Sequence, residues 1–235
     1  MTMKPVIFID GREGTTGLQI YDRLTPRQDI ELLLIDEEKR KDPAERKKCL
    51  NAADLVFLCL PDDAAREAVA MIENPNTKVI DASTAHRTAE GWAYGFPELS
   101  LKHREAIIHS KRVANPGCHA SGFISSVYPL VQLGLIPPDH PLCAYSLTGY
   151  SGGGKKLIAE YQDPRHESAR IYGTTLHHKH LPEMVHVCGL DAPPVFHPIL
   201  GDYIQGMATT VMLRNDTLPG GPTAYNIYNV LDAYY

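Results

Sequence analysis

The chain has 235 residues, of which 43% are hydrophobic and 22% are charged, and its formal net charge is −5. This composition is typical of a globular protein with one large domain or two small ones. The negative balance excludes a broad basic surface for nucleic acid, and no apolar run reaches the roughly 18 residues that cross a membrane.

Five cysteines, an odd number without a CxxC pair, argue against a disulfide framework and a zinc knuckle. We therefore expect free thiols in a reducing compartment. Because the N-terminus shows no cleavable signal pattern, we expect a cytoplasmic protein. Four cysteines are interpreted as small core residues: Cys49, Cys59, Cys143 and Cys188.

Strands and helices alternate along the first half of the chain. The segments PVIFIDG, IELLLID, ADLVFLCLP and TKVIDAS predict strands, and GLQIYDRL and AAREAVAMI have helical periodicity. Continuous apolar runs indicate strands buried on both faces of a parallel sheet, which predicts a doubly wound α/β domain over about the first 115 residues. The basic run EEKRKDPAERKK (37–48) is interpreted as a solvated loop and helix face.

The character of the chain changes after ANPG (114–117). The segments CHASGFISSVYPLVQLG and PTAYNIYNVLDAYY predict helices, the second with Pro222 in its first turn, and LCAYSLTGYS and QGMATTVML predict strands. Residues 161–198 are rich in His, Pro and Gly, which predicts long connections. The chain ends at Tyr235 inside a predicted helix, and we interpret it as truncated at its C-terminus.

A glycine turn follows the first predicted strand. DGREGTTG places Gly11, Gly14 and Gly17 between that strand and the first helix, a GxxGxxG variant of the dinucleotide fingerprint. The first glycine permits the tight turn, the second lets backbone approach a pyrophosphate, and the third lets the helix pack on the sheet. The helix N-terminus then faces the phosphates.

The choice between NAD and NADP stays open on spacing alone. Asp36 lies at the end of the second strand, where an acid holds the ribose 2′-hydroxyl of NAD. Arg12 lies inside the turn, and the basic residues 39–41 follow the second strand. These cations are suited to a 2′-phosphate.

Cys118 follows an Asn-Pro-Gly turn. Asn115 is expected to cap a helix and Pro116 to occupy its first position, which places Cys118 in the first turn. There the unpaired N–H groups and the helix dipole stabilise a thiolate, and the same groups can bind an oxyanion. His119 is not expected to be its base, because adjacent helical residues point apart. The alternative is an ordinary core cysteine.

The segment LHHKHLPE carries several histidines. Pro182 biases Leu181 towards an extended conformation, in which His178 and His180 point to the same side. This suits a general acid/base pair, and exposed or structural histidines are the alternative. A zinc site needs further ligands, for which only Glu183 and His186 are close in sequence.

A second glycine run, GYSGGGKK, falls between a predicted strand and a predicted helix. It fits a P-loop except at Lys156, where Ser or Thr is needed to hold magnesium. We interpret the run as a loop in which glycines closely approach a cofactor or substrate.

Five motifs in chain order resemble those of one enzyme family, N-acetyl-γ-glutamyl-phosphate reductase. They are GREGTTG (similar to its shorter, type 2 branch), DASTAHR, NPGC, TGYSGGGK and HHKHLPE. The resemblance implies a Rossmann dinucleotide-binding domain, residues 1–117. It also implies a catalytic and dimerisation α+β domain of the semialdehyde and glyceraldehyde-phosphate dehydrogenase kind, residues 118–235, incomplete at its C-terminal end.

The resemblance also implies the chemistry: NADP-dependent reductive dephosphorylation of N-acetyl-L-glutamyl 5-phosphate to N-acetyl-L-glutamate 5-semialdehyde, in arginine biosynthesis. Cys118 attacks the acyl phosphate to give a thioester, which the cofactor reduces. His180 is the expected acid/base, with His178 as its neighbour or substitute. The family implies a homodimer or homotetramer and a small-molecule substrate, without nucleic acid, membrane or metal.

The implied binding residues fall into two sets. The cofactor set is Gly11, Arg12, Gly14, Thr15, Thr16, Gly17, Gly152 and Gly153, with Arg12 favoured for the 2′-phosphate. The substrate set is Ser83, Thr84, Arg87 and Asn115, in which Arg87 holds the leaving phosphate.

Three rival functions fit the sequence less well. Aspartate-semialdehyde dehydrogenase has Asn-Cys after Pro-Asn where this chain has NPGC. A non-catalytic NADP-sensing module needs neither Cys118 after NPG nor the HHKHLPE segment. A cysteine hydrolase leaves GREGTTG unexplained.

Overall fold

The computed structural model describes residues 4–12 and 14–235, which form two compact units. The first unit comprises the described residues up to Pro97 together with Leu101–Pro116. The second comprises Glu98–Ser100 and Gly117–Tyr235. No helix in this described part of the chain combines the length and the apolarity that a membrane crossing needs.

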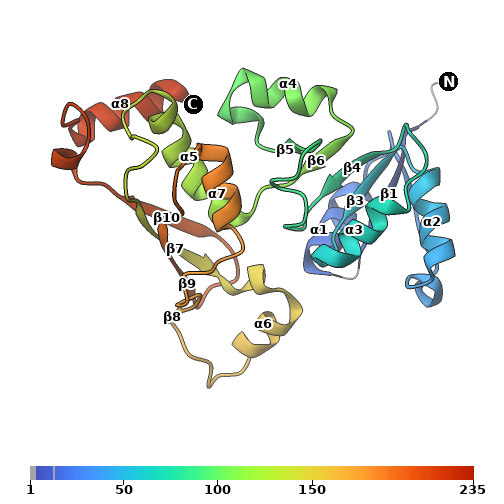
Figure 1. The fold of residues 1–235 in the computed structure, drawn as a ribbon. Coiled ribbons are helices and arrows are strands. Elements are labelled where there is room, and N and C mark those ends of the chain that lie inside the picture. Colours follow the sequence, from blue (N-terminus) through green and yellow to red (C-terminus); the bar gives the residue numbers. More distant parts are fainter. Residues whose placement is uncertain (1–3, 13) are drawn as a thin grey trace. The chain divides into compact units, whose positions relative to one another are not determined.

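The first unit is built on a six-stranded sheet in the order β2-β1-β3-β4-β6-β5 (Figure 1). The strands are β1 (Val6–Asp10), β2 (Glu31–Leu33), β3 (Leu55–Leu58), β4 (Lys78–Asp81), β5 (Ala93–Tyr94) and β6 (Arg112–Ala114). Every pairing is parallel, so the parallel sheet predicted from continuous apolar runs is confirmed.

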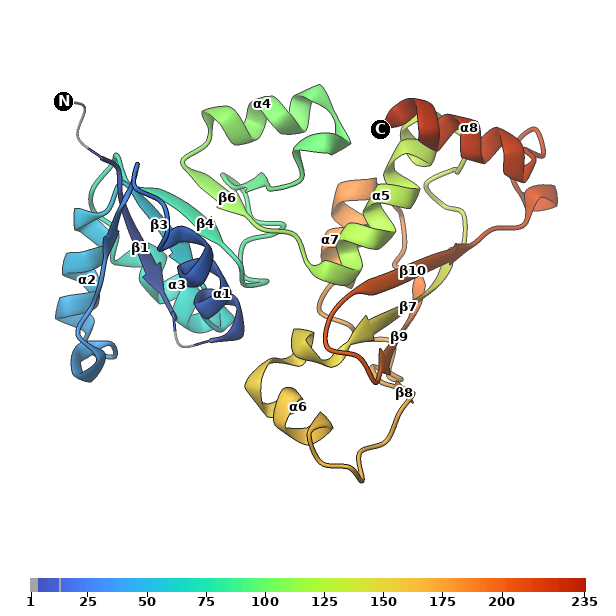
Figure 2. The same cartoon turned by 180° about the vertical axis from the view of Figure 1, so that it is seen from behind.

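Helices cover both faces of this sheet. They are α1 (Thr15–Leu24), α2 (Pro43–Ala52), α3 (Asp62–Ala70) and α4 (Leu101–His109). Leu50 of α2 and Ala65 of α3 share one core with Phe8 and Val56 of the sheet, and all four are buried. Across the sheet, the chain steps from β1 to β2 in one direction and from β2 to β3 in the opposite direction. Right-handed crossovers therefore place α1 on the face opposite to α2 and α3 (Figure 2). The strand order therefore reverses between β1 and β3, where doubly wound sheets bind ligands.

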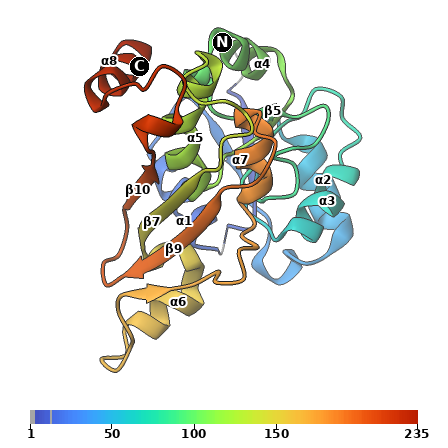
Figure 3. The ribbon, with the colours of Figure 1, turned by 60° about the vertical axis from the view of Figure 1, so that its left-hand side comes forward.

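The second unit is built on a four-stranded mixed sheet in the order β10-β7-β9-β8. Its strands are β7 (Cys143–Gly149), β8 (Arg170–Ile171), β9 (Val195–Gly201) and β10 (Met207–Met212), and its helices are α5 (Cys118–Gln132), α6 (Gly154–Tyr161), α7 (Leu181–Cys188) and α8 (Ala224–Tyr234). Helices α5 and α7 lie together on one face (Figure 3). Gly122 permits the close packing of α5, because a Cβ there would lie 2.4 Å from Oγ1 of Thr209.

Short 3-10 helices complete both units. They are η1 (Glu37–Lys39), η2 (Pro97–Leu99), η3 (Tyr150–Gly153) and η4 (Asn215–Thr217).

The proline inside α5 is compensated by the end of α8. Pro129 has no N–H, so the carbonyl of Ser125 cannot receive its usual helical hydrogen bond. The hydroxyl of Tyr235 donates to that carbonyl at 2.9 Å. This contact ties the last turn of α8 to the middle of α5.

Two expectations for the second unit are wrong. Residues 161–198, predicted as long connections, contain α7 and the start of β9, whose tertiary packing overrides their His, Pro and Gly content. Pro222 lies before α8 rather than in its first turn. The helix is capped by Thr223, whose Oγ1 accepts from the Asn226 N–H while the Asn226 side chain accepts from the Thr223 N–H.

Candidate functional site

The three glycines of the turn after β1 differ in whether, and why, the fold needs glycine at their positions. Gly11 has a φ of +89°, and a Cβ there would lie 2.4 Å from the carbonyl oxygen of Cys59. A Cβ on Gly17 would lie 2.4 Å from the carbonyl oxygen of Gly11, so α1 packs directly on the turn. Gly14 has ordinary extended backbone, and a Cβ there would approach protein atoms no closer than 3.4 Å. The fold thus requires glycine at two of the three positions, whereas a Cβ at the third would make only ordinary van der Waals contacts.

A cavity of about 450 Å³ opens beside this turn, at the carboxyl ends of β1, β2 and β3. Its apolar walls include Tyr21, Leu33, Ile35, Leu60 and Pro61. Its charged walls are Asp10, Arg12, Glu37, Arg40, Lys41 and Arg46. The volume and the combination of apolar walls with charged groups suit a small-molecule or cofactor site.

Of the residues that the sequence predicts around this turn, the following do not line the cavity: Thr15, Thr16, Gly17, Asp36 and Lys39. The side chain of Asp36, considered for the ribose 2′-hydroxyl, accepts a hydrogen bond from the Glu38 N–H at 3.2 Å and caps η1. Thr15 and Thr16 are the first two residues of α1 and present its first-turn N–H groups instead. Glu13 lies outside the described residues.

Arg46 is a cavity residue that sequence reasoning missed. The run 37–48 was expected to be solvated, but the Arg46 side chain is only 11% exposed. Its Nη2 and Nε donate to Oδ2 of Asp10 at 2.8 and 3.2 Å. Asp10 ends β1, so this ion pair lies at the start of the glycine turn. The partner is 36 residues away in sequence, so no local pattern reveals the pair.

The loop after β4 is held by buried carboxylates. Asp81 is fully buried and accepts from the Ser83 N–H and hydroxyl at 2.9 and 2.7 Å. Nδ1 of His86 donates to the same carboxylate at 2.6 Å, and the His86 ring stacks on Trp92 with centroids 4.1 Å apart. Asp81 and His86 thereby fix both ends of the loop that carries the predicted substrate residues.

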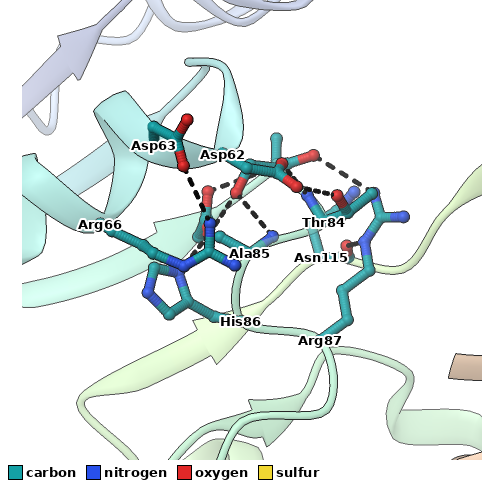
Figure 4. Close-up of polar contacts among 11 residues, drawn as sticks. Asp62, Asp63, Arg66, Thr84, Ala85, His86, Arg87 and Asn115 are labelled. Atoms are coloured by element: carbon teal, nitrogen blue, oxygen red, sulfur yellow. Dashed lines mark hydrogen bonds and ion pairs between the residues drawn. The ribbon is translucent and has the colours of Figure 1, made fainter. Parts of the chain in front are cut away.

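Figure 4 shows the predicted substrate residues Thr84 and Arg87 on this loop, together with Asn115, which follows β6 and contacts Arg87. Asp62, the first residue of α3, accepts from the N–H and the hydroxyl of Thr84. The Arg87 guanidinium donates from Nε to the Asn115 carbonyl at 2.9 Å and from Nη2 to the Ala82 carbonyl at 3.3 Å. Arg87 is 9% exposed, and these backbone carbonyls orient its guanidinium.

Cys118 is the first residue of α5, and it is exposed. The N-cap is Gly117, so the prediction of Asn115 as cap with Pro116 in the first turn is wrong. The reason is non-local: the Asn115 N–H donates to the Asp81 carbonyl at 2.8 Å and continues the β4–β6 ladder beyond the assigned strands. The prediction that Cys118 lies in the first helical turn is confirmed.

Glu183 is a buried acid that contacts the residue before Cys118. It is 2% exposed, and its Oε2 accepts from the Gly117 N–H at 3.0 Å. This bond connects α7 to the residue preceding Cys118. Sequence reasoning considered Glu183 only as a metal ligand. The described residues hold no group of three or more His, Cys, Asp or Glu side chains arranged for a metal ion.

Three histidines and a tyrosine cluster in the second unit. The rings of His178 and His180 meet at a centroid distance of 4.7 Å, and that of His119 lies 5.3 and 5.7 Å from them. Nε2 of His119 lies 2.7 Å from the Tyr172 hydroxyl. His119 and Tyr172 are additions from the structure, since the tyrosine is remote in sequence.

The two predicted histidines meet for a different reason than expected. Leu181 is helical, with Pro182 in the first turn of α7, and His180 is the N-cap in right-handed helical backbone. The expected extended conformation is therefore wrong. A turn brings the rings together, and the His180 N–H donates to Nδ1 of His178 at 3.2 Å. Because that nitrogen accepts, a neutral His178 carries its proton on Nε2.

Burial sets the protonation of the cluster. It lowers the pKa of His119 and of His178 from 6.5 to about 4, with smaller contributions from neighbouring Lys179. It raises the pKa of Tyr172 to about 12, and the charge of a Cys118 thiolate acts in the same direction. At neutral pH these two imidazoles are uncharged and the phenol keeps its proton.

The second glycine run forms η3 and the start of α6. A Cβ on Gly153 would lie 2.4 Å from the Leu157 side chain, so packing against α6 is enough to require glycine at this position. A Cβ on Gly152 would meet only Oγ1 of Thr148, at 4.0 Å, and the residue is exposed. The turn at Tyr203–Gly206 supports this run, because the carbonyl of Tyr203 accepts from the Tyr150 N–H at 3.0 Å.

Comparisons with known proteins agree with this architecture. The family described as "Semialdehyde dehydrogenase, NAD binding domain" matches residues 28–107, and "Semialdehyde dehydrogenase, dimerisation domain" matches residues 118–235. The chain is 49% identical over 234 residues to N-acetyl-gamma-glutamyl-phosphate reductase 2 of Pseudomonas putida, covering 98% of this chain and 75% of the relative. It is 51% identical over 237 residues to N-acetyl-gamma-glutamyl-phosphate reductase of Chelativorans sp., covering 100% and 76%. The chain belongs to the N-acetyl-γ-glutamyl-phosphate reductase family.

Membership in the reductase family makes the chain an oxidoreductase with an NAD(P)-binding domain and a dimerisation domain of the semialdehyde dehydrogenase kind. The fold agrees with that of more distant enzymes. Aspartate semialdehyde dehydrogenase II of Vibrio cholerae, complexed with ASA, superposes with a TM-score of 0.72 at 12% identity, over 98% of this chain and 79% of the other. The corresponding enzyme of Candida albicans with NADP has a TM-score of 0.63 at 16% identity, over 97% and 76%.

Proposed function

We propose that this reductase converts N-acetyl-L-glutamyl 5-phosphate to N-acetyl-L-glutamate 5-semialdehyde with NADPH, through a thioester on Cys118, as a step of arginine biosynthesis. The observation that carries the proposal is the exposed Cys118 at the first position of α5, next in the chain to His119 of the histidine cluster. The printed names of the relatives supply the substrate.

The position of Cys118 suits attack on an acyl phosphate. The first-turn N–H groups of α5 have no partners within the helix, and the helix dipole stabilises negative charge there. They can hold the oxyanion that forms on the substrate carbonyl when the sulfur attacks. The sulfur forms a bond to the acyl carbon, the bond from that carbon to the phosphate oxygen breaks, and inorganic phosphate leaves. Glu183 holds the turn in place through the Gly117 N–H.

The phosphate leaving group is assigned to the loop after β4. Arg87 offers a guanidinium that two backbone carbonyls orient, and Ser83 and Thr84 offer hydroxyls and N–H groups on the same loop. Charge-assisted hydrogen bonds from such a set favour a leaving dianion. Asn115, whose carbonyl holds Arg87, is proposed as the fourth substrate residue.

The acid/base role is assigned to His180, with His178 beside it. His180 is 4% exposed, and its backbone N–H fixes the tautomer of His178. A neutral His178 presents an Nε2–H that can donate to a developing oxyanion without changing its charge. His180 gives a proton to the alkoxide oxygen of the reduced thioester, which yields the thiohemiacetal. It takes that proton back when the carbon–sulfur bond breaks, which releases the aldehyde and leaves the negative charge on the Cys118 sulfur.

The cavity beside the glycine turn fits a dinucleotide, because Gly11 and Gly14 line it and the exposed Gly14 lets a ligand approach the backbone. When bound, the nicotinamide cofactor supplies the hydride that reduces the thioester. We propose NADP(H) rather than NAD(H), because Arg12, Arg40 and Lys41 line the cavity while the Asp36 carboxylate caps η1. We also propose that the remaining predicted residues contact the cofactor: Gly11, Thr15, Thr16, Gly17, Gly152 and Gly153.

We further propose that residues 1–117 bind the cofactor and residues 118–235 carry catalysis and assembly as a homodimer or homotetramer. The dimerisation-domain match and the sheet face opposite α5 and α7 support assembly, since that face exposes Tyr145, Val195 and Met212. Five free cysteines fit a reducing cytoplasm.

Steady-state kinetics test this function. NADPH oxidation is followed with N-acetyl-L-glutamyl 5-phosphate for the native chain, Cys118→Ala and Arg87→Met, with NADH as the alternative cofactor. We expect no turnover in Cys118→Ala and a raised KM for the acyl phosphate in Arg87→Met. Full activity of Cys118→Ala would contradict the covalent route, and equal kcat/KM with NADH would contradict the NADP assignment.

A further inference from the structure

Arg46 is a cation in the wall of the cavity beside the glycine turn, and the proposed reaction gives it no role. It lies in α2, three and four residues before Cys49 and Leu50, which are both buried. Helical spacing therefore places Arg46 on the face of α2 that packs on the sheet. Its side chain is only 11% exposed, whereas Arg40 and Lys41 of the same cavity are exposed. Packing thus restricts Arg46 more than it restricts these two cations of the loop before α2.

The guanidinium of Arg46 is bound along one edge. Its Nε and Nη2 donate to Oδ2 of Asp10 at 3.2 and 2.8 Å. Nη1 carries two further N–H donors, and it makes no hydrogen bond to another residue in the described part of the chain. It is not enclosed either, since the enclosed side-chain nitrogens without a partner among the described residues are both on histidines. Because the guanidinium is planar, its bond to Asp10 also fixes the direction of these two unused donors.

The charges around the cavity suit a bound phosphate. Among the described residues that line it, four cations face two carboxylates: Arg12, Arg40, Lys41 and Arg46 against Asp10 and Glu37. This excess of positive charge matches a phosphate monoester, which carries close to two negative charges at neutral pH.

The position of Arg46 indicates which phosphate of a dinucleotide it meets. In dinucleotide-binding sheets the pyrophosphate lies at the N-terminus of the first helix, whereas the ribose that carries the 2′-hydroxyl lies near the end of the second strand. Arg46 belongs to the segment that follows β2, and the cavity reaches that strand end because Leu33, Leu34 and Ile35 line it. In NADP this ribose carries the 2′-phosphate.

We propose that Nη1 of Arg46 binds the 2′-phosphate of NADP(H), so that Arg46 sets the preference for this cofactor over NAD(H). The inference rests on the proposed function for the choice of cofactor and adds a specificity-determining residue to it. The bond from Nη1 to the phosphate is charge-assisted. Because Asp10 and the packing of α2 already orient the guanidinium, binding costs little further side-chain entropy.

The test is the affinity of the chain for NADPH and for NADH, which differ only in the 2′-phosphate. Dissociation constants are measured by isothermal titration calorimetry in about 0.15 M salt, where distant exposed charges are largely screened. Binding needs no acyl phosphate, so the result does not depend on turnover. We expect Arg46→Met to weaken NADPH binding about ten- to a hundredfold, the loss expected for a hydrogen bond between charged groups, and to leave NADH binding nearly unchanged.

Two further variants separate this contact from a general effect. Asp10→Asn/Arg46→Met removes both members of the largely buried pair and so leaves no unpaired charge. It should lose the preference for NADPH as Arg46→Met does. Lys48→Met removes an exposed cation of the same helix that does not line the cavity, and it should keep the native preference.

The outcomes distinguish this inference from the proposed cofactor. If the native chain binds NADPH and NADH equally, the NADP assignment itself fails, and Arg46 has no 2′-phosphate to bind. If the native chain prefers NADPH, the same preference in Arg46→Met or in the double variant would overturn the inference alone. Equal weakening of both cofactors would also overturn it, because Arg46 would then contact the part that they share. So would a loss in Lys48→Met as large as that in Arg46→Met.

Discussion

Replacing Gly11 by alanine should destabilise the first unit by about 2–5 kcal/mol. The φ of +89° costs a residue with a side chain about 1–2 kcal/mol. The new Cβ would also lie 2.4 Å from the carbonyl oxygen of Cys59, which is backbone and cannot rotate away. Relieving that overlap requires the turn to shift from the end of β3, at a further cost of about 1–3 kcal/mol.

Gly91 provides the matched control. Its φ is +79°, and no atom lies within 4 Å of the position that a Cβ would occupy. Gly91→Ala should therefore lose only the conformational part, about 1–2 kcal/mol. The difference between the two variants isolates the close approach of backbone at the glycine turn.

Urea unfolding followed by tryptophan fluorescence measures both variants. Trp92 is the single tryptophan of the chain, and it stacks on His86 in the first unit, so its emission reports that unit. Titration with NADPH gives a second readout, because a shifted turn should weaken cofactor binding only in Gly11→Ala. Equal losses of stability in the two variants would refute the argument from the Cys59 carbonyl.

Other parts of the structure give further predictions. Asp10→Asn should lower the free energy of unfolding by about 3–5 kcal/mol, because it leaves the largely buried Arg46 guanidinium unpaired. The double variant Asp10→Asn/Arg46→Met should recover most of that loss in urea unfolding, and no recovery would contradict the pairing of the two charges. Tyr235→Phe should lower thermal stability by about 1 kcal/mol by removing the donor to an α5 carbonyl, and an unchanged melting temperature would count against that bond. The pKa of His119 is lowered on folding from 6.5 to about 4, so the unfolded chain binds a proton more readily, and stability should fall by about 3 kcal/mol as the pH drops through that interval. His119→Gln should flatten this dependence, and an unaltered pH profile of the urea midpoint would contradict it.

The elements predicted correctly are those whose own residues carry the signal. Continuous apolar runs identify β1, β3 and β4, and the glycine turn stands where the pattern places it. The predicted strand IELLLID is shortened to Glu31–Leu33, because Asp36 caps η1 soon afterwards. Helix α7 and strand β9 were missed, since Pro182 and Pro198 weaken the local pattern and only packing in the second unit reveals it.

The site shows the same limit. Cys118 and the histidine pair have local signatures, whereas Arg46, Tyr172 and Glu183 act through partners 36 to 66 residues away in the chain. The error at the start of α5 has the same origin, because the N–H of Asn115 is taken by the carbonyl of Asp81. This bond continues the β4–β6 ladder through Asn115, and the helix begins only after Gly117.

The most direct test of the central claim is to trap the thioester. The chain is mixed with N-acetyl-L-glutamyl 5-phosphate without NADPH, and released phosphate and protein mass are measured together. We predict one phosphate released per chain, an N-acetylglutamyl group on the peptide that contains Cys118, and removal of that group by hydroxylamine or by NADPH. Phosphate release without an adduct, or the same adduct in Cys118→Ala, would contradict covalent catalysis by Cys118.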